Sequence, residues 1–586
     1  MPAVRQKLHL SPRSNLRSRL IVSIQECSVQ TKSIIMILLR FVVFSTSAVA
    51  GASNETCPEC VTLEGGMAKG VIEDGILSLK GIPYAAPPVS ELRFRPPSLP
   101  NHWQGILPAA NYRTICPQIE DPLESYPKAA MAHEVVVGGV TTRLFEDEDC
   151  LYLNVWKPAK QVRNLPIMIY LPGGGFIAGG ASDVYNGAAV ARKDVVVVTI
   201  NYRIGLLGFA ELGALDPSYS GSGNNGLRDQ IAALEWVRRN ATALGGDSDN
   251  VTVFGESAGS ISIAAHLVSP SLKKPFQRAI LQSGAYNLIR TRRSAEATVK
   301  KVMDVGSLKT MAQIKTAPVR DLLLQAQATG EPDGFFAPVA DGSWVALDPA
   351  EAFASGTSRH VGIMLGTNAN EMNYWAMYDS KFRNPYVEDT DLGAKIDVFS
   401  MLPSIGNTSE AKREKVKRKL LSTYEKVLGT TDQRTIEAAL VDDVIMTQPA
   451  THLAERQSAS GGKVWLYRFT WHVPPKYLDP ALPALGAFHS IELPFMFGTG
   501  DFSQIPGGLA LSKAPGPEIS RLANQMLTAW TNFAKKGDPN GAGVPEWPSY
   551  DTNKRVVMVW SADSEAVADP DRSRREIWER WHFNPY

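Results

Sequence analysis

The sequence lacks several features that would point to particular classes of protein. Lysine and arginine number 60 and aspartate and glutamate 59, so the net charge of +1 creates no global field for nucleic acid or an anionic membrane. Zinc-ligand, Walker and EF-hand spacings are missing, as are internal repeats. We therefore expect no metal, no cofactor and no nucleic-acid partner. A chain of 586 residues that is 44% hydrophobic can still build a large core.

Long hydrophobic runs are also scarce. Residues 33–52 form an apolar stretch that Arg40 interrupts, and the stretch is too short for an integral membrane span. It ends in the small residues Ala48-Val49-Ala50, a pattern typical of a secretory signal peptide. We expect residues 1–50 to be an N-terminal extension plus signal peptide, and residues 51–586 to be one secreted domain. Translation can start at Met1 or at Met36; a start at Met36 gives a signal of ordinary length and is preferred.

Cysteine is rare, with five in the chain. Removal of a signal peptide leaves Cys57, Cys60, Cys116 and Cys150. Four cysteines in an oxidising compartment suggest two disulfides, which can be connected in three ways. Cys57 and Cys60 have the spacing of a redox pair, but no βαβ pattern surrounds them, so a local bridge is preferred. Secretion also fits the N-glycosylation sequons at Asn54, Asn240 and Asn407.

The strongest local pattern surrounds Ser257. A β-branched and aromatic run at 251–254 predicts a buried strand, and the apolar run at 261–267 predicts a helix. Between them stands Gly255-Glu256-Ser257-Ala258-Gly259, the arrangement of a nucleophile elbow. In so sharp a turn, Cβ atoms two residues on either side of the serine would clash, and glycine removes them. We predict that Ser257 is a catalytic nucleophile; the alternative is an ordinary strand-to-helix turn.

A second glycine-rich segment follows the predicted strand at 166–171. Such a cluster can bind phosphate, but the Gly-Lys-Ser/Thr and Gly-x-Gly-x-x-Gly patterns are missing here. An oxyanion hole is the better interpretation, because Gly174 and Gly175 can turn backbone N–H groups inward and Ala258 can supply a third. The alternative is a purely structural loop.

A serine nucleophile needs a histidine base and a carboxylate that orients it. His266 lies nine residues along the predicted helix, about 13 Å from Ser257, which is too far for a base. His489 stands in a glycine-led loop and is preferred to His472.

The expected chain order places the carboxylate between the serine and the histidine. Glu371 follows a predicted strand at 361–365, which places it at the sheet edge that also holds Ser257. Asp341 is the rival, although its Asp-Gly sequence is typical of a plain turn.

The larger pattern alternates strands with helices and predicts the α/β class, with a mostly parallel central sheet and helices on both faces. Residues 148–155 and 245–259, within matches that run from residue 81 to residue 550, are similar to the two signatures of the type-B carboxylesterase/lipase family. In character the chain resembles the fungal secreted carboxylesterases. The resemblance implies an α/β-hydrolase fold and the hydrolysis of a small-molecule ester through an acyl-enzyme.

The resemblance also implies roles for individual residues. It assigns Ser257, Glu371 and His489 to the triad and Gly174, Gly175 and Ala258 to the oxyanion hole, and it implies a Cys116–Cys150 disulfide. It further implies that Ser283 supports the acid and that Glu256 acts beside the nucleophile. Val140 stands where cholinesterases carry a tryptophan, so choline esters are not expected. The same triad could instead serve an acyltransferase, or a lipase for long-chain acylglycerols.

Overall fold

The computed structural model describes residues 57–118, 134–137, 140–143, 145–329, 336–376, 408–472, 486–498, 516–579, 581 and 583. The predicted signal peptide and the sequons at Asn54 and Asn407 lie outside these residues. Contacts group the described part into one compact unit, Cys57–Tyr586. The predicted domain boundary at residue 50 stays a prediction.

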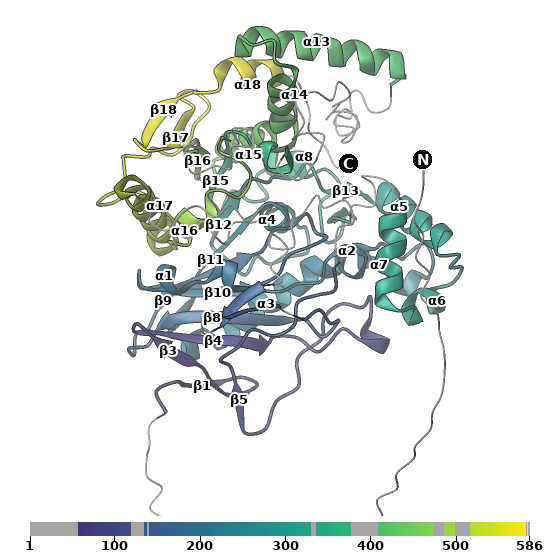
Figure 1. Cartoon of the computed structure of the whole chain (residues 1–586), viewed down its shortest axis with the longest axis vertical. Helices are drawn as coiled ribbons and strands as arrows, with labels where there is room; N and C mark the ends of the chain where they lie inside the picture. Colours follow the sequence, from purple (N-terminus) through teal and green to yellow (C-terminus); the bar gives the residue numbers. More distant parts are fainter. Residues whose placement is uncertain are drawn as a thin grey trace, which may run out of the picture. The chain divides into compact units, whose positions relative to one another are not determined.

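A large twisted sheet forms the centre of this unit (Figure 1). Every neighbouring pair from β17 to β10 is parallel, and antiparallel strands complete both edges. This confirms the prediction of a mostly parallel sheet. The strand order is β18 (Glu565–Ala568), β17 (Val556–Trp560), β16 (Val464–Phe469), β15 (Gly362–Asn368), β12 (Arg278–Gln282), β11 (Gly246–Glu256), β9 (Leu165–Leu171), β10 (Val196–Ile200), β8 (Tyr152–Pro158), β4 (Ile76–Pro83) and β3 (Val71–Glu73).

Both faces of the sheet are buried, which explains why its central strands are continuous apolar runs. Successive side chains of a strand point to opposite faces. In β9, Ile167, Ile169 and Leu171 therefore join one hydrophobic cluster, while Met168 and Tyr170 join another. The sheet separates two cores that share strands but not side chains.

Helices cover each face, as predicted. The first core contains side chains from α3 (Asn225–Leu244), α4 (Ala258–Leu267) and α15 (Gln448–Ala459). The second contains side chains from α1 (Ala188–Ala191), α16 (Leu493–Met496) and α17 (Pro517–Lys536). Helix α17 ends at Lys536, and the next residue, Gly537, has a φ of 72° that suits a residue without a side chain.

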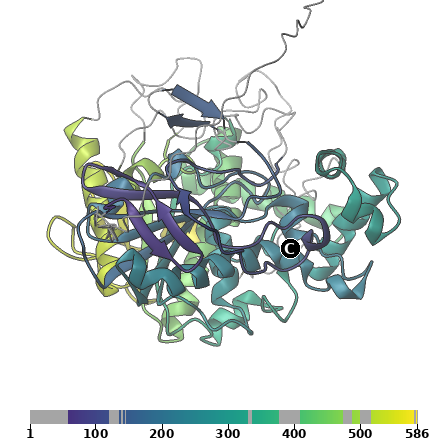
Figure 2. The same cartoon turned by 90° about the horizontal axis from the view of Figure 1, so that it is seen from below.

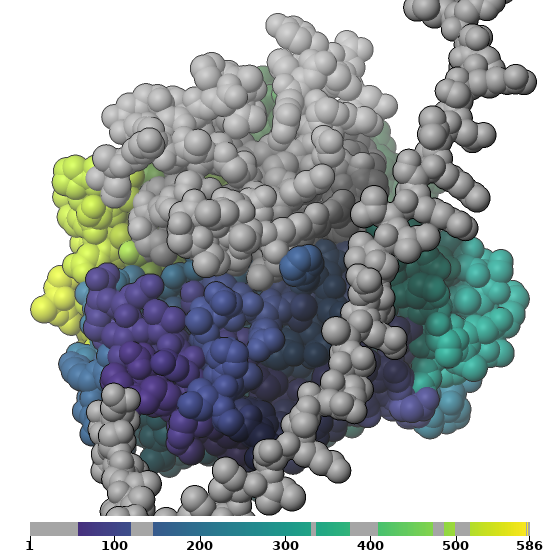
Figure 3. All heavy atoms as spheres, turned by 60° about the horizontal axis from the view of Figure 1, so that its bottom comes forward, coloured from purple at the N-terminus to yellow at the C-terminus, as the bar shows by residue number. Residues whose placement is uncertain are grey.

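Smaller elements surround this framework. A three-stranded sheet joins β1 (Cys60–Leu63), β2 (Gly66–Lys69) and β5 (Ile106–Pro108). Helices α5 (Arg292–Val305), α6 (Met311–Thr316) and α7 (Val319–Ala328) belong to the teal part of the chain. In Figure 2 this teal part lies to one side of the purple N-terminal strands, and Figure 3 shows teal and purple atoms on opposite sides of the same face. Helices α13 (Glu410–Leu428), α14 (Gln433–Asp442) and α18 (Arg572–Trp578) form another group (Figure 1). None of the described helices is long and apolar enough to cross a membrane.

The four described cysteines form two disulfides, Cys57–Cys60 and Cys116–Cys150. This confirms the preferred local bridge and the pairing that the resemblance implied. Disulfides are typical of oxidising compartments, and secretion stays a prediction.

We expect the two bridges to differ in their contribution to stability. Cys116–Cys150 spans 34 positions, so changing both cysteines to alanine should lower the free energy of unfolding by about 4 kcal/mol in the chain-entropy model. The matched pair Cys57→Ala and Cys60→Ala opens a bridge that spans only three positions and should have a smaller effect. Thermal melting of the two double variants measures the difference. An equal loss in both would contradict the loop-entropy argument.

Asn240 lies in a position that disfavours the predicted glycan. Its side chain is only 2% exposed. Its Nδ2 donates to the carbonyl of Trp236 (2.9 Å), and its Oδ1 accepts from the N–H of Glu64 (2.8 Å). A sugar on this amide would displace both hydrogen bonds and the packing around them.

Candidate active site

Ser257 stands at the sharp junction between β11 and α4. The strand ends at Glu256 and the helix begins at Ala258, so the serine is the N-cap of the helix. Its φ of 55° and ψ of −121° fall outside the regions that ordinary residues prefer. Strain of this kind is typical of a nucleophile elbow, which presents the hydroxyl at the carboxyl end of a strand.

The two glycines that flank the serine are required by close backbone contacts. A Cβ on Gly259 would lie 1.9 Å from the carbonyl oxygen of Leu171. A Cβ on Gly255 would lie 2.8 Å from the same oxygen and from the carbonyl carbon of Gly259. The sharpness of the turn predicted a clash at the elbow itself. The structure adds that the elbow packs directly on the end of β9, where the glycine-rich loop begins.

That loop lies against the nucleophile. A Cβ on Gly173 would meet the Cβ of Ser257 at 3.0 Å. Gly174 has φ of 112° and Gly175 has φ of 60°, positive values that residues with a side chain rarely adopt. Within the described part of the chain, the N–H groups of Gly174, Gly175 and Ala258 have no acceptor. These are the three donors that were predicted to form an oxyanion hole.

His489 and Glu371 meet at the same sheet edge. Nδ1 of His489 lies 2.7 Å from Oε2 of Glu371, and both side chains are almost fully buried. Glu371 follows β15, which is parallel to β12 and, through it, to β11, so the expected placement at one edge is correct.

Backbone contacts fix the loop that carries His489 to residues 369–372, the acid turn, which carry Glu371. The N–H of His489 donates to the carbonyl of Glu371 (3.3 Å), and the N–H of Asn370 donates to the carbonyl of Ala487 (2.9 Å). Oδ1 of Asn370 accepts from the N–H of Ala487 (3.1 Å). The base and its carboxylate are thus held as one unit.

The second nitrogen of the imidazole faces Glu256. Nε2 lies 3.0 Å from Oε1 of Glu256, which also accepts a hydrogen bond from Oγ of Ser490 (2.6 Å). An imidazole with a carboxylate at each nitrogen donates from both, which requires the protonated ring. Burial lowers the pKa of His489, but Glu256 and Glu371 together outweigh it and raise the pKa well above its usual value.

The rival residues lie elsewhere or have other partners. Oδ1 of Asp341 accepts three backbone N–H groups, from Ser343, Trp344 and Val345, as expected for an Asp-Gly turn. His472 is exposed. His266 is buried and bonded to Gln230 through Nε2 (2.8 Å), in agreement with the prediction that it is a packed helix residue.

Ser283, which the resemblance places in support of the acid, is fully buried. Its N–H donates to the carbonyl of Gly366 (2.9 Å), while its Oγ has no partner among the described residues. The N–H of Asn368 instead donates to Oε1 of Glu371 (2.7 Å). Support of the acid by the Ser283 hydroxyl stays a prediction.

Glu492, a further buried carboxyl group near Glu256 and Glu371, was not predicted from the sequence. Its oxygens accept from Gln282 (3.0 Å) and Asn368 (2.7 Å). Burial and the nearby charge of Glu256 raise its pKa to about 7. A glutamate within the apolar run 491–497 was the available signal, because such a residue is rarely buried without partners. Among the described residues, no group of three or more His, Cys, Asp and Glu side chains is placed to hold a metal.

The fold and the elbow define an α/β-hydrolase with a serine at the nucleophile position. The sequence profile of the carboxylesterase family matches residues 58–578. Para-nitrobenzyl esterase of Bacillus subtilis (strain 168) is 35% identical over 530 residues, which cover 88% of this chain and 98% of the relative. Carboxylesterase 5A of Mus musculus is 32% identical over 489 residues, covering 82% and 80%.

A solved structure agrees with these sequence relatives. The carboxylesterase Est55 of Geobacillus stearothermophilus, at pH 6.2, has a TM-score of 0.71 and 31% identity, covering 88% of this chain and 99% of the other. This chain belongs to the carboxylesterase family and is a carboxylic ester hydrolase.

Proposed function

We propose that this hydrolase acts through a triad of Ser257 as nucleophile, His489 as general base and Glu371 as the carboxylate that orients the base. The observation that carries the proposal is the buried 2.7 Å contact between His489 and Glu371, at the sheet edge where the strained Ser257 follows β11. The Ser-acid-His chain order is the one this fold uses.

In the first step, Oγ of Ser257 attacks the ester carbonyl carbon and its proton moves to Nε2 of His489. The oxyanion that forms accepts hydrogen bonds from Gly174, Gly175 and Ala258. His489 then gives the proton to the alcohol oxygen, the C–O bond breaks, and an acyl-enzyme remains. Water repeats the sequence and releases the acid. Each cycle requires a neutral Nε2 beside Ser257. The imidazole ring of His489 therefore turns from Glu256 toward Ser257 before the attack.

The proposed substrates are small carboxylic esters. The names of the relatives, para-nitrobenzyl esterase and carboxylesterase 5A, support this class. The test is the rate of p-nitrophenol release from p-nitrophenyl esters of increasing acyl length. We expect saturable turnover of short and medium acyl chains. Turnover that appears only above the solubility limit of long-chain substrates would identify a lipase, and acyl transfer to an added alcohol without hydrolysis would identify a transferase.

Glu256 should control the pH at which the base works. Activity requires neutral His489, so it is present above the histidine pKa and is lost as the pH falls through that pKa. Because Glu256 raises this pKa, the change Glu256→Gln should lower it and move the acidic limb of the kcat/KM profile to lower pH. The plateau rate should also fall, because the variant loses a carboxylate that stabilises the imidazolium.

The control for this experiment is Asp341→Asn, which neutralises a carboxyl group that closes a turn through Oδ1 and accepts from Nδ2 of Asn224 through Oδ2. Its pH profile should match that of the wild type. An acidic limb of Glu256→Gln that stays in place, or that moves to higher pH, would contradict the role given to Glu256.

A further inference from the structure

A buried π-helix, η6 (Asp443–Thr447), joins α14 to α15. π-Helical turns are rare and often occur at functional sites. All of its side chains are buried, and Nδ2 of Asn287, from the segment that follows β12, donates to the carbonyl of Ile445 (3.1 Å). This π-helical turn packs against β15, the strand that leads to the acid turn.

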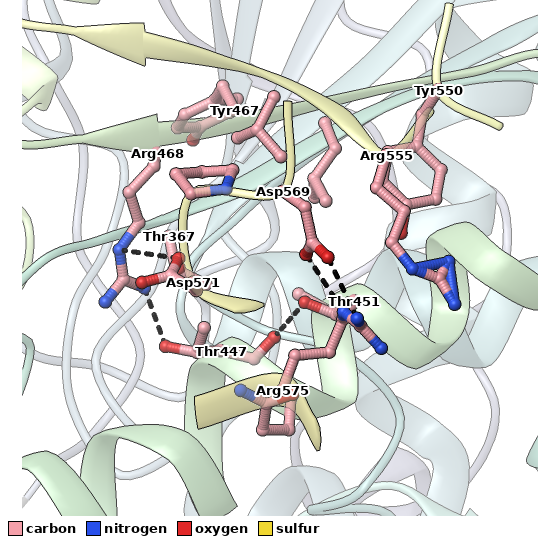
Figure 4. Close-up of a pocket in the computed structure, with 15 residues that line it drawn as sticks. Thr367, Thr447, Thr451, Tyr467, Arg468, Tyr550, Arg555, Asp569, Asp571 and Arg575 are labelled. Carbon is pink, nitrogen blue, oxygen red and sulfur yellow. Dashed lines mark hydrogen bonds and ion pairs between the residues drawn. The ribbon is translucent and has the colours of Figure 1, made fainter. Parts of the chain in front are cut away.

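Two contacts connect the ends of this π-helical turn to the acid turn. At its start, Oδ1 of Asp442 accepts from the N–H of Met372 (2.7 Å), the residue after Glu371. At its end, Nη1 of Arg468 in β16 donates to the hydroxyls of both Thr367 and Thr447 (2.7 Å each), as Figure 4 shows. The chain is therefore held on both sides of Glu371, at the backbone N–H of Met372 after it and at the side chain of Thr367 before it.

We propose that Asp442 is a positioning residue for the triad: it holds the backbone after Glu371 so that this carboxylate stays on Nδ1 of His489. The inference rests on the proposed triad. In the same turn, the N–H of Asn368 fixes the other carboxylate oxygen of Glu371 at 2.7 Å. Asn368 at the end of β15 thus holds the carboxylate of Glu371 directly, and Asp442 at the end of α14 holds the backbone that follows Glu371.

The proposed role of Asp442 requires a hydrogen-bond acceptor for the Met372 N–H and does not require a negative charge. Asp442 is 2% exposed, and burial raises its pKa to about 7. The bond from Met372 and the charges of Arg574 and Arg468 act in the opposite direction, while the charge of Glu371 acts in the same direction. Both the ionised and the protonated carboxyl group keep an oxygen that can accept the Met372 N–H.

The test compares Asp442→Ala, which removes the acceptor, with Asp442→Asn, which keeps an acceptor oxygen of the same shape. Asp442→Ala should lower kcat by about 10- to 100-fold, because small misplacements of a catalytic group have effects of this size, with KM within about threefold. Asp442→Asn should restore kcat to within about threefold of the wild type. The control is Glu437→Ala on the same helix, whose carboxylate is bonded to Gln433 and should not affect kcat.

Several outcomes would overturn the inference. Wild-type kcat in Asp442→Ala, or an equal loss of kcat in Asp442→Asn, would show that the acceptor does not position the acid. Should Asp442→Ala fail to fold, Asp442→Ser replaces it: its hydroxyl is one bond shorter than the carboxylate oxygens, and an unchanged kcat in that variant would overturn the inference. If the Ser257→Ala variant turned over substrate at the wild-type rate in the same assay, the proposed triad itself would be refuted. Failure of the triad can therefore be distinguished from failure of the role given to Asp442.

Discussion

Replacing Ser257 with alanine is expected to lower kcat for p-nitrophenyl esters by at least about 10⁴-fold, as removal of a triad nucleophile does in other serine hydrolases. The variant keeps the glycine loop, the buried His489–Glu371 pair and the elbow, so it should still bind ester. It lacks the oxygen that becomes acylated, and the remaining rate would come from the oxyanion donors alone. Release of p-nitrophenol by the purified proteins gives the measurement.

A serine three positions away provides the matched control. Ser260 is fully buried and its Oγ donates to the carbonyl of Gly284 (2.7 Å), so this hydroxyl is already engaged inside the protein. Ser260→Ala should keep its turnover and its reaction with a fluorophosphonate probe, whereas Ser257→Ala should lose both. Probe labelling of Ser257→Ala at the wild-type rate would identify a different nucleophile.

Gly259→Ala should damage both the fold and the activity. The Cβ added by this substitution would lie 1.9 Å from the carbonyl oxygen of Leu171. This oxygen belongs to the backbone, so it cannot rotate away as the end of a side chain could. We expect a loss of about 3 kcal/mol or more in the free energy of unfolding, at the upper end of the range for overpacking. Activity should fall as well, because Leu171 precedes the glycine loop that supplies oxyanion donors.

The control here is Gly516→Ala. Gly516 is the N-cap of α17 with φ of −64°, and no heavy atom lies within 4 Å of the position of an added Cβ. Its melting temperature and kcat should stay close to those of the wild type. A Gly259→Ala protein with wild-type melting temperature and kcat would show that the elbow can move away from β9 without loss.

Local patterns were sufficient to predict the parts of the site that are contiguous in sequence. The elbow at Ser257 and the glycine loop are each a strand followed by a defined turn. The turn alone indicates that glycines are needed there, but the contact that excludes a side chain at Gly259 comes from the carbonyl of Leu171 in β9. The choice of Glu371 needed one further step, namely that the carboxyl ends of parallel strands meet at one edge.

The supporting contacts could not be predicted in this way. Asp442 and Met372 are 70 positions apart, and Glu492 and Asn368 are 124 apart, so no local period connects them. The position of Nε2 of His489 beside Glu256 likewise depends on how the loop at 486–492 packs on the elbow. Such pairings are set by tertiary packing, and the sequence shows only that a carboxyl group stands in an apolar run.

The separation of the two cores by the sheet has a consequence for protein engineering. Substitutions at positions in contact influence one another, whereas changes more than about 7–10 Å apart usually add. Side chains of α3 and α17 lie in different cores, on opposite faces of the strands. Stabilising substitutions selected separately in these two helices can therefore be combined with nearly additive gains, and libraries for each face can be screened independently.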